Sequence, residues 1–167
     1  KVTEEAPAVK TFRLEFMNPE EAANFEFFTG QFGLYSAFGE GESTFCIASS
    51  PTRKGYIECT FRAVGRVTSA LATKEEGDIV GFRGPYGNLF PLDAWRGKNL
   101  LFIAGGIALP PLRSVIWNCL DRRADFENIT VLYGARSVAD LVYKHELRDW
   151  EDRCDIDLVV TVDPGGE

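Results

Sequence analysis

The 167-residue sequence is poor in the residues that most often hold metal ions. It contains one histidine, His145, and four widely separated cysteines, Cys46, Cys59, Cys119 and Cys154. Since no two cysteines form a C-x-x-C pair, the spacing excludes a zinc knuckle or an iron–sulfur loop within this chain, and we predict no metal site. A chain with this much apolar sequence needs no disulfide framework, so we expect reduced thiols and a cytoplasmic protein.

Clustered positive charge and long apolar runs are also lacking. The formal net charge is −7 with no lysine–arginine cluster, which makes nucleic acid a poor candidate for a partner. No run approaches the roughly 20 apolar residues of a transmembrane segment. The start, KVTEEAPAVK, lacks the apolar core of a signal peptide, and because it does not begin with methionine we expect a few residues to be missing there.

The first part of the chain has the pattern of a small antiparallel β-barrel. Short apolar stretches are separated by turn formers such as Asn18-Pro19. We predict strands at residues 9–17, 31–37, 44–48, 55–62 and 78–83. One helix is expected after Gly65. Thr68 or Ser69 can cap its first turn, and Leu71 would pack inward.

From about residue 97 the pattern changes to alternating strands and helices. The expected strands are NLLFIAGG, which we predict to be buried on both faces, NITVLYGAR and DIDLVVTVD. Between them, PPLRSVIWNCLDRR predicts a helix with prolines in its first turn, and VADLVYKHELRDWEDR a second helix. This order indicates a parallel α/β sheet.

The predicted fold class is therefore a Greek-key antiparallel β-barrel over residues 1–96, followed by a partial α/β nucleotide-binding domain over residues 97–167. Three strands with two helices make only part of a doubly wound domain. We accordingly expect a fragment, or a protein that another polypeptide completes.

Two glycine-containing turns have the composition of phosphate sites. In AGGIALPPLRS, glycines end a strand and open a helix, so free N–H groups and the helix dipole favour a pyrophosphate. A tight turn without a ligand is the alternative, because the third glycine of G-x-G-x-x-G is missing. In GRVTSAL a glycine precedes two hydroxyl residues at a helix start, which alone is an ordinary N-cap. Each of the two turns could therefore hold one dinucleotide.

The order of these segments resembles the ferredoxin–NADP reductase superfamily, in which a flavin-binding barrel precedes a nicotinamide-dinucleotide domain. The resemblance covers nearly the whole chain and rests on GESTFCIASSP, VGRVTSAL, GPYGNLFP, AGGIALPPLRS and VLYGARSVADLVYKHEL. Within the superfamily the chain is most similar to the anaerobic electron-transfer branch. That branch holds sulfhydrogenase gamma subunits, the corresponding subunit of anaerobic sulfite reductase and the electron-transfer subunit of dihydroorotate dehydrogenase.

The resemblance implies a flavin site around TFCIASSP. In the family motif R-x-Y-S, Ser43 stands in the Arg position, Phe45 in the Tyr position and Cys46 in the Ser position. Phe45 would set its ring against the isoalloxazine. Cys46, the catalytic candidate, would face flavin N5 with its backbone N–H and a weak thiol donor, unless it is simply a small buried hydrophobe. Because the Arg is lost, Arg62 or Arg66 would pair with the flavin phosphate. The FAD contacts implied are Ser43, Thr44, Phe45, Cys46, Thr60, Phe61, Arg62, Gly65, Arg66, Val67, Thr68 and Ser69.

The same resemblance implies a nicotinamide site at the glycine loop. The family loop is G-G-x-G-[IL]-A-P, and this chain has Ala108 in place of a glycine, a mild obstacle to close backbone approach. Arg136 follows the next strand, where such folds hold the adenosine. It would meet a 2′-phosphate or stack on adenine, so both NAD and NADP stay open. The dinucleotide contacts implied are Gly105, Gly106, Ala108, Pro110, Gly134 and Arg136.

The function implied is that of a flavin-dependent oxidoreductase subunit. It would pass electrons in either direction between NAD(P)H and an iron–sulfur partner through FAD, with hydride transfer to or from flavin N5. The partners would be iron–sulfur, hydrogenase or reductase subunits, with a [2Fe–2S] cluster in a missing C-terminal segment or in a partner. The alternative is an assembly subunit that uses its barrel and sheet for docking, with flavin structural or absent.

Overall fold

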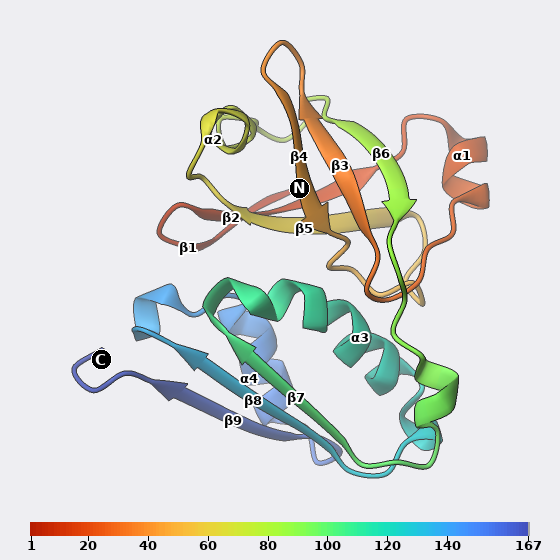
Figure 1. Cartoon of the computed structure of the whole chain (residues 1–167), viewed down its shortest axis with the longest axis vertical. Coiled ribbons are helices and arrows are strands. Elements are labelled where there is room, and N and C mark those ends of the chain that lie inside the picture. The colour runs from red at the N-terminus through yellow and green to blue at the C-terminus, as the bar shows by residue number, and fades with distance from the viewer. Residues whose placement is uncertain (167) are drawn as a thin grey trace.

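The computed structural model describes residues 1–166 and places an antiparallel β unit against a parallel α/β unit (Figure 1). The β unit contains two three-stranded antiparallel sheets. In order across each sheet, the strands are β1 (Val2–Ala6), β2 (Val9–Glu15) and β5 (Tyr56–Arg62), then β4 (Gly41–Cys46), β3 (Phe32–Ala37) and β6 (Gly81–Tyr86). Two short helices, α1 (Pro19–Asn24) and α2 (Arg66–Ala72), complete the unit. The predicted antiparallel barrel architecture is confirmed, whereas β1 and α1 were not predicted.

Alternation of buried and partly exposed residues is strict on β3, which supplies part of the core of the β unit. On β3, Gly33, Tyr35 and Ala37 are buried, while the residues between them are partly exposed. Position 33 tolerates no side chain, because a Cβ there would collide with the ring of Phe82. Tyr35 meets that same ring edge-on, with centroids 5.2 Å apart. The inner faces of the two sheets therefore close on a tightly packed aromatic core.

Helix α2 forms where the glycine and hydroxyl pattern predicted it. Gly65 is the N-cap residue, and the Thr68 hydroxyl accepts hydrogen bonds from the Gly65 and Val64 N–H groups at 2.8 and 3.0 Å. Thr68 thus satisfies the helix start from the third helical position rather than from the cap itself. Leu71 is buried, as predicted, and anchors the helix on the barrel core.

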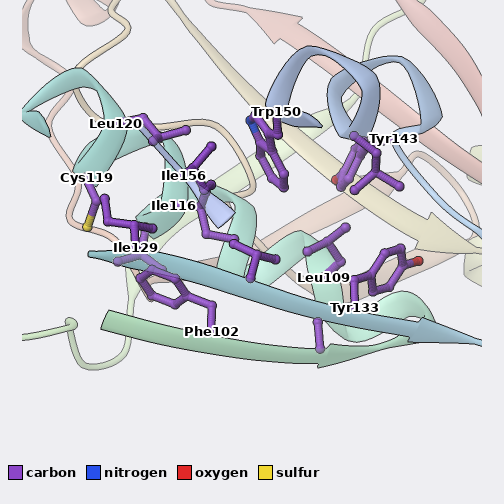
Figure 2. Packing of buried hydrophobic residues seen from close by; sticks show 14 of the residues in the cluster. Phe102, Leu109, Ile116, Cys119, Leu120, Ile129, Tyr133, Tyr143, Trp150 and Ile156 are labelled. Atoms are coloured by element: carbon purple, nitrogen blue, oxygen red, sulfur yellow. The ribbon is translucent and has the colours of Figure 1, made fainter. Parts of the chain in front are cut away.

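The α/β unit is a parallel sheet in the order β7 (Leu100–Gly105), β8 (Ile129–Ala135), β9 (Asp157–Val162). Helices α3 (Leu109–Asp121) and α4 (Lys144–Glu151) both lie on the face that is turned toward the β unit (Figure 1). Figure 2 shows how Phe102 and Ile129 from the strands meet Ile116 and Trp150 from the helices in one apolar core. The β-α-β-α-β order and the prolines in the first turn of α3 are confirmed.

Two details of the sequence prediction are wrong in this unit. The helix expected from VADLVYKHELRDWEDR is broken: a 3₁₀ turn spans Val138–Asp140, and α4 begins only at Lys144. Tyr143 lies between them with φ +56°, a left-handed conformation that interrupts any α-helix. The buried Tyr143 hydroxyl is hydrogen-bonded to Thr60, and its N–H donates to Glu5, so contacts with the β unit hold this break.

The strand NLLFIAGG is buried on one face rather than on both. Phe102 and Ala104 are buried beneath the helices, whereas Leu101 and Ile103 are 62% and 63% exposed. Within residues 1–166 both helices occupy the same side of the sheet, so the opposite face of β7 carries no covering element. Apolar composition indicates that the strand can be buried, but not how much of it is covered here.

The two units share a polar and apolar contact surface. Val9 of β2 is fully buried in the core of the α/β unit, and Phe90 packs on its edge. The Ser114 hydroxyl donates to the Ser49 carbonyl at 2.8 Å across the contact. Our division of the chain into domains between residues 96 and 97 remains a prediction.

Within residues 1–166, none of the helices has the length and apolar composition that crossing a membrane requires.

Candidate functional site

The end of β4 presents Phe45 and Cys46 to opposite sides of the strand. Phe45 pairs with inward-facing Gly33, and its ring stacks on Phe61 with centroids 5.2 Å apart and an interplanar angle of 26°. Cys46 pairs with Phe32, and its thiol lies within reach of the Arg113 charge of the α/β unit. Phe45 is therefore largely occupied by the barrel core, and only its partly exposed portion is free to meet a ligand.

Cys46 is a neutral thiol at the contact between the units. Burial raises its pKa to about 12, against the opposing effects of a backbone hydrogen bond and of the Arg113 charge. A thiol with this pKa is protonated at neutral pH, so it can donate a weak hydrogen bond but is a poor nucleophile. The structure therefore suits the positioning role considered for Cys46 and leaves no basis for covalent chemistry at this residue.

The middle of β5 does not present side chains to a ligand. Phe61 is buried in the barrel core, and Thr60 is buried between Thr11, 2.7 Å away, and the hydroxyl of Tyr143. The predicted FAD contacts of these two residues are thus limited to backbone atoms. On the neighbouring β4, the Thr44 side chain is exposed and that of Ser43 is partly exposed.

The end of β5 is different, because charged side chains from both units meet there. Arg62 is partly exposed and helps to lower the pKa of Asp140, after the hydrogen bond from Ser137 and the charge of Arg136. Arg136 itself lies 3.4 Å from Asp140. Arg66, farther along, pairs with Glu40 at 2.6 Å on the exposed surface. Arg62 of the β unit and Arg136 of the α/β unit thus both act on Asp140.

At α2, Val67 is partly exposed and packs on the barrel core, and Ser69 is exposed. The Thr68 hydroxyl is already engaged by the helix start, so a phosphate there would be met by backbone N–H groups and Ser69.

The glycine loop lies at the carboxyl ends of the parallel strands. Gly105 of β7 is in register with Gly134 of β8, and Gly106 has φ +51°. No heavy atom lies within 4 Å of a Cβ built on Gly105 or Gly106, so the space above the loop is open. The Gly106 carbonyl accepts a hydrogen bond from the Tyr133 hydroxyl at 3.1 Å, which fixes the turn. Such an open, glycine-lined strand end is where α/β sheets bind dinucleotides.

Two other residues of this loop have opposite environments. Ala108 is exposed and directly precedes α3. Pro110 is buried in the first turn of α3, so the contact expected for it is limited to backbone atoms.

Sequence reasoning missed a buried ionic cluster beside this site. Arg113 of α3 contacts Glu146 of α4 and Glu58 of β5, and stacks on the ring of Tyr143 at 4.7 Å. The three charged residues are far apart in the sequence, and each occurs within an ordinary helix or strand pattern. The one signal for it was an arginine among apolar residues in PPLRSVIW.

A separate cavity of about 700 Å³ opens at the end of the barrel between β2 and the segment that leads into β6. Phe12, Ile57 and Phe82 form part of its wall, and Lys74 and Glu76 lie at its rim. None of the predicted cofactor contacts lines it. The candidate site is therefore the strand-end region between the units and not this cavity.

The architecture agrees with comparisons to known proteins. Residues 2–90 match the oxidoreductase FAD-binding domain family, and residues 102–164 match the oxidoreductase NAD-binding domain family. The chain belongs to the ferredoxin–NADP reductase superfamily. It therefore combines a flavin-binding barrel with a nicotinamide-dinucleotide unit.

Individual relatives agree with this membership. The chain is 44% identical over 138 residues to the sulfhydrogenase 2 gamma subunit of Pyrococcus furiosus, covering 83% of this chain and 47% of that protein. It is 31% identical over 162 residues to a probable dihydroorotate dehydrogenase B electron-transfer subunit of the same organism, covering 97% and 56%. A ferredoxin–NADP⁺ reductase structure from Neisseria gonorrhoeae superposes with a TM-score of 0.78 at 19% identity, covering 99% and 68%. The chain thus spans about half the length of the curated relatives.

Proposed function

We propose that this chain is the flavin- and nicotinamide-binding part of an electron-transfer subunit, which passes electrons between NAD(P)H and an iron–sulfur partner through FAD. The observation that carries the proposal is that both units contribute candidate contacts at strand ends. These are Cys46 at the end of β4, near the Arg113 charge, the open loop at Gly105 and Gly106 after β7, and the cations Arg62 and Arg136, which both act on Asp140. An anionic dinucleotide on each unit fits that arrangement.

The residues of the β unit would hold FAD. The isoalloxazine would lie against the end of β4, where the Cys46 backbone N–H and its neutral thiol face the reactive edge and Thr44 is exposed. Gly65 and Ser69 at the start of α2 would face the phosphates. Arg62 is placed to supply the positive charge that the Arg-to-Ser difference at position 43 removes.

The residues of the α/β unit would hold the nicotinamide dinucleotide. Gly105 and Gly106 allow the phosphates to approach the backbone, Gly134 keeps the neighbouring strand end open, and Arg136 would meet the adenosine end. The flavin, when bound, supplies the exchange between two-electron hydride transfer and single-electron transfer. The protein's own contribution is to orient the two rings and to exclude water, and no side chain is required as an acid or base.

The partner is proposed from the relatives. Their names describe a hydrogenase gamma subunit and an electron-transfer subunit, so we propose a hydrogenase or reductase assembly as the partner of this chain too. Free cysteines at Cys46, Cys59, Cys119 and Cys154 agree with a reducing compartment, and we propose the cytoplasm.

The test is to purify the protein gently, release any bound cofactor and identify it by mass. We expect yellow protein with one FAD per chain, and bleaching of the flavin absorbance on anaerobic addition of NADH or NADPH. The Arg62→Gln variant should lose FAD more readily, whereas Arg153→Gln, which removes an ion pair to Asp155 in the α/β unit, should retain it. Colourless protein that cannot be reconstituted with FAD would refute the proposal and favour an assembly role without flavin.

A further inference from the structure

Arg113 joins the two units at one buried point. Its side chain is 7% exposed, and its Nη1 donates to the Ala48 carbonyl at 2.9 Å and to the Glu58 carboxylate at 2.6 Å, both in the β unit. On the other side its Nε and Nη2 donate to the Glu146 carboxylate at 2.6–3.0 Å, within the α/β unit. One guanidinium therefore holds three chain segments besides its own helix.

Two of the segments that meet on Arg113 adjoin the candidate flavin edge at Cys46 and the candidate dinucleotide loop at Gly105 and Gly106. Ala48 lies two residues after Cys46, on the segment that continues from β4. Arg113 lies seven residues after Gly106, on the helix that the glycine loop opens. The bond from Nη1 to the Ala48 carbonyl thus links the segment after Cys46 directly to the helix that follows the glycine loop.

The cluster around Arg113 is tightly ordered. Burial alone would raise the pKa of Glu146, but the hydrogen bonds and charge of Arg113, with a hydrogen bond from Trp117 at 2.6 Å, lower it instead. The Glu58 and Glu146 carboxylates both pair with the Arg113 guanidinium. The Tyr143 ring lies against the same guanidinium at 4.7 Å. A planar guanidinium can hold acceptors on two sides at once, whereas a lysine ammonium is a single point charge.

We propose that Arg113 is a positioning residue that sets the placement of the nicotinamide loop relative to the flavin edge. The inference rests on the proposed function, because it needs a ring at each site. Hydride transfer requires the reacting atoms to lie about 3–3.5 Å apart, and each ring would be held by a different unit. A small shift between the units would therefore alter the reaction without removing either binding site.

The test compares Arg113→Lys with a matched control, Arg123→Lys. Arg123 is a partly buried arginine of the same unit that donates to the Asp155 and Phe126 carbonyls at 2.7 and 2.6 Å, wholly within the α/β unit. Both variants lose guanidinium hydrogen bonds, but only Arg113→Lys disturbs the contact between the units.

Two readouts are needed, of which the first requires no cofactor. In the FAD-free protein, hydrogen exchange should become faster at residues 47–50 and 105–110 in Arg113→Lys and stay unchanged there in Arg123→Lys. In the FAD-loaded protein, flavin reduction at saturating NADH should slow by about 10- to 100-fold in Arg113→Lys. The long-wavelength charge-transfer absorbance, which reports stacking of the two rings, should weaken in parallel, with FAD content unchanged.

Each outcome bears on the positioning role of Arg113. Equal exchange and equal reduction rates in the two variants would overturn that role. Loss of FAD from Arg113→Lys with a normal rate in the fraction that keeps it would also overturn it, since Arg113 would then support binding alone. A wild-type protein that binds no FAD would instead refute the proposed function, while the exchange comparison would still decide whether Arg113 fixes the two segments.

Discussion

Replacing Arg113 by methionine removes the cation that Glu146 and Glu58 share. The two carboxylate side chains are only 9% and 14% exposed, so neither can recover full hydration. Breaking a buried ion pair by removing one partner typically costs about 3–5 kcal/mol of the free energy of unfolding. For a chain of this size each kcal/mol lowers the melting temperature by about 2–4 °C, so we expect a decrease of about 6–20 °C at neutral pH.

The pH dependence of stability provides a sharper test than the size of the loss. In the wild type the folded-state pKa of Glu146 lies below its usual value of 4.5. Glu146 therefore stabilises the folded state above the unfolded pKa near 4.5, and this stabilisation is lost as pH falls through the folded pKa. In Arg113→Met only the Trp117 hydrogen bond and the His145 charge still oppose burial, and we expect burial to raise the folded pKa of Glu146. The contribution of Glu146 is then present below the unfolded pKa and is lost as pH rises above about 4.5.

Thermal unfolding followed by circular dichroism at pH 5, 6, 7 and 8 measures both effects. We expect a nearly flat profile for the wild type over this range and a melting temperature that falls with rising pH for Arg113→Met. The double variant Arg113→Met/Glu146→Gln should recover part of the loss and the flat profile. Arg83→Met, which removes the exposed pair with Glu42, serves as a control without a slope. A flat profile for Arg113→Met, or a loss below about 1 kcal/mol, would refute the reasoning.

Three further predictions concern other parts of the molecule. With a pKa of about 12, Cys46 should resist iodoacetamide at pH 8 in the folded protein while exposed Cys154 reacts, and mass spectrometry showing equal labelling would contradict this. Gly106→Ala should lower the free energy of unfolding by roughly 1–2 kcal/mol, because the φ of Gly106 is +51°. Gly105→Ala, at φ −127°, should lower it less in the same denaturant titration, and equal losses would contradict the strain argument. Ile103→Thr on the uncovered face of β7 should change the free energy of unfolding of this chain by less than about 1 kcal/mol, and a loss typical of a core residue would show that this face is covered.

Much of the architecture was accessible to prediction because its signals are local. The alternation on β3, the glycine before α2 with the hydroxyl residues of its first turns, and the prolines that open α3 each act within a few residues. The same holds for the glycine loop, whose open space follows from the absence of side chains. Strand β1 was missed because VTEEA carries two acidic residues, and its place in a sheet comes from pairing with β2.

The site was predicted less completely, because side-chain direction depends on what lies across the strand. Phe45 was expected to set its ring against a flavin, and the structure stacks part of that ring on Phe61 of the neighbouring sheet. Thr60 belonged to the expected flavin contacts, and its hydroxyl is bonded to that of Tyr143, a residue 83 positions later. These contacts with distant segments leave no periodic signal in the sequence.

The amino-acid sequence by itself determined two units of different kinds, two glycine-containing turns at helix starts and the superfamily to which the chain belongs. Only the tertiary structure decided that Arg113 joins the two units, that Tyr143 interrupts the second helix and that one face of β7 has no covering element within residues 1–166. The reason is physical: propensity and periodicity act between neighbours along the chain, whereas the environment of a buried charge depends on every element that packs around it.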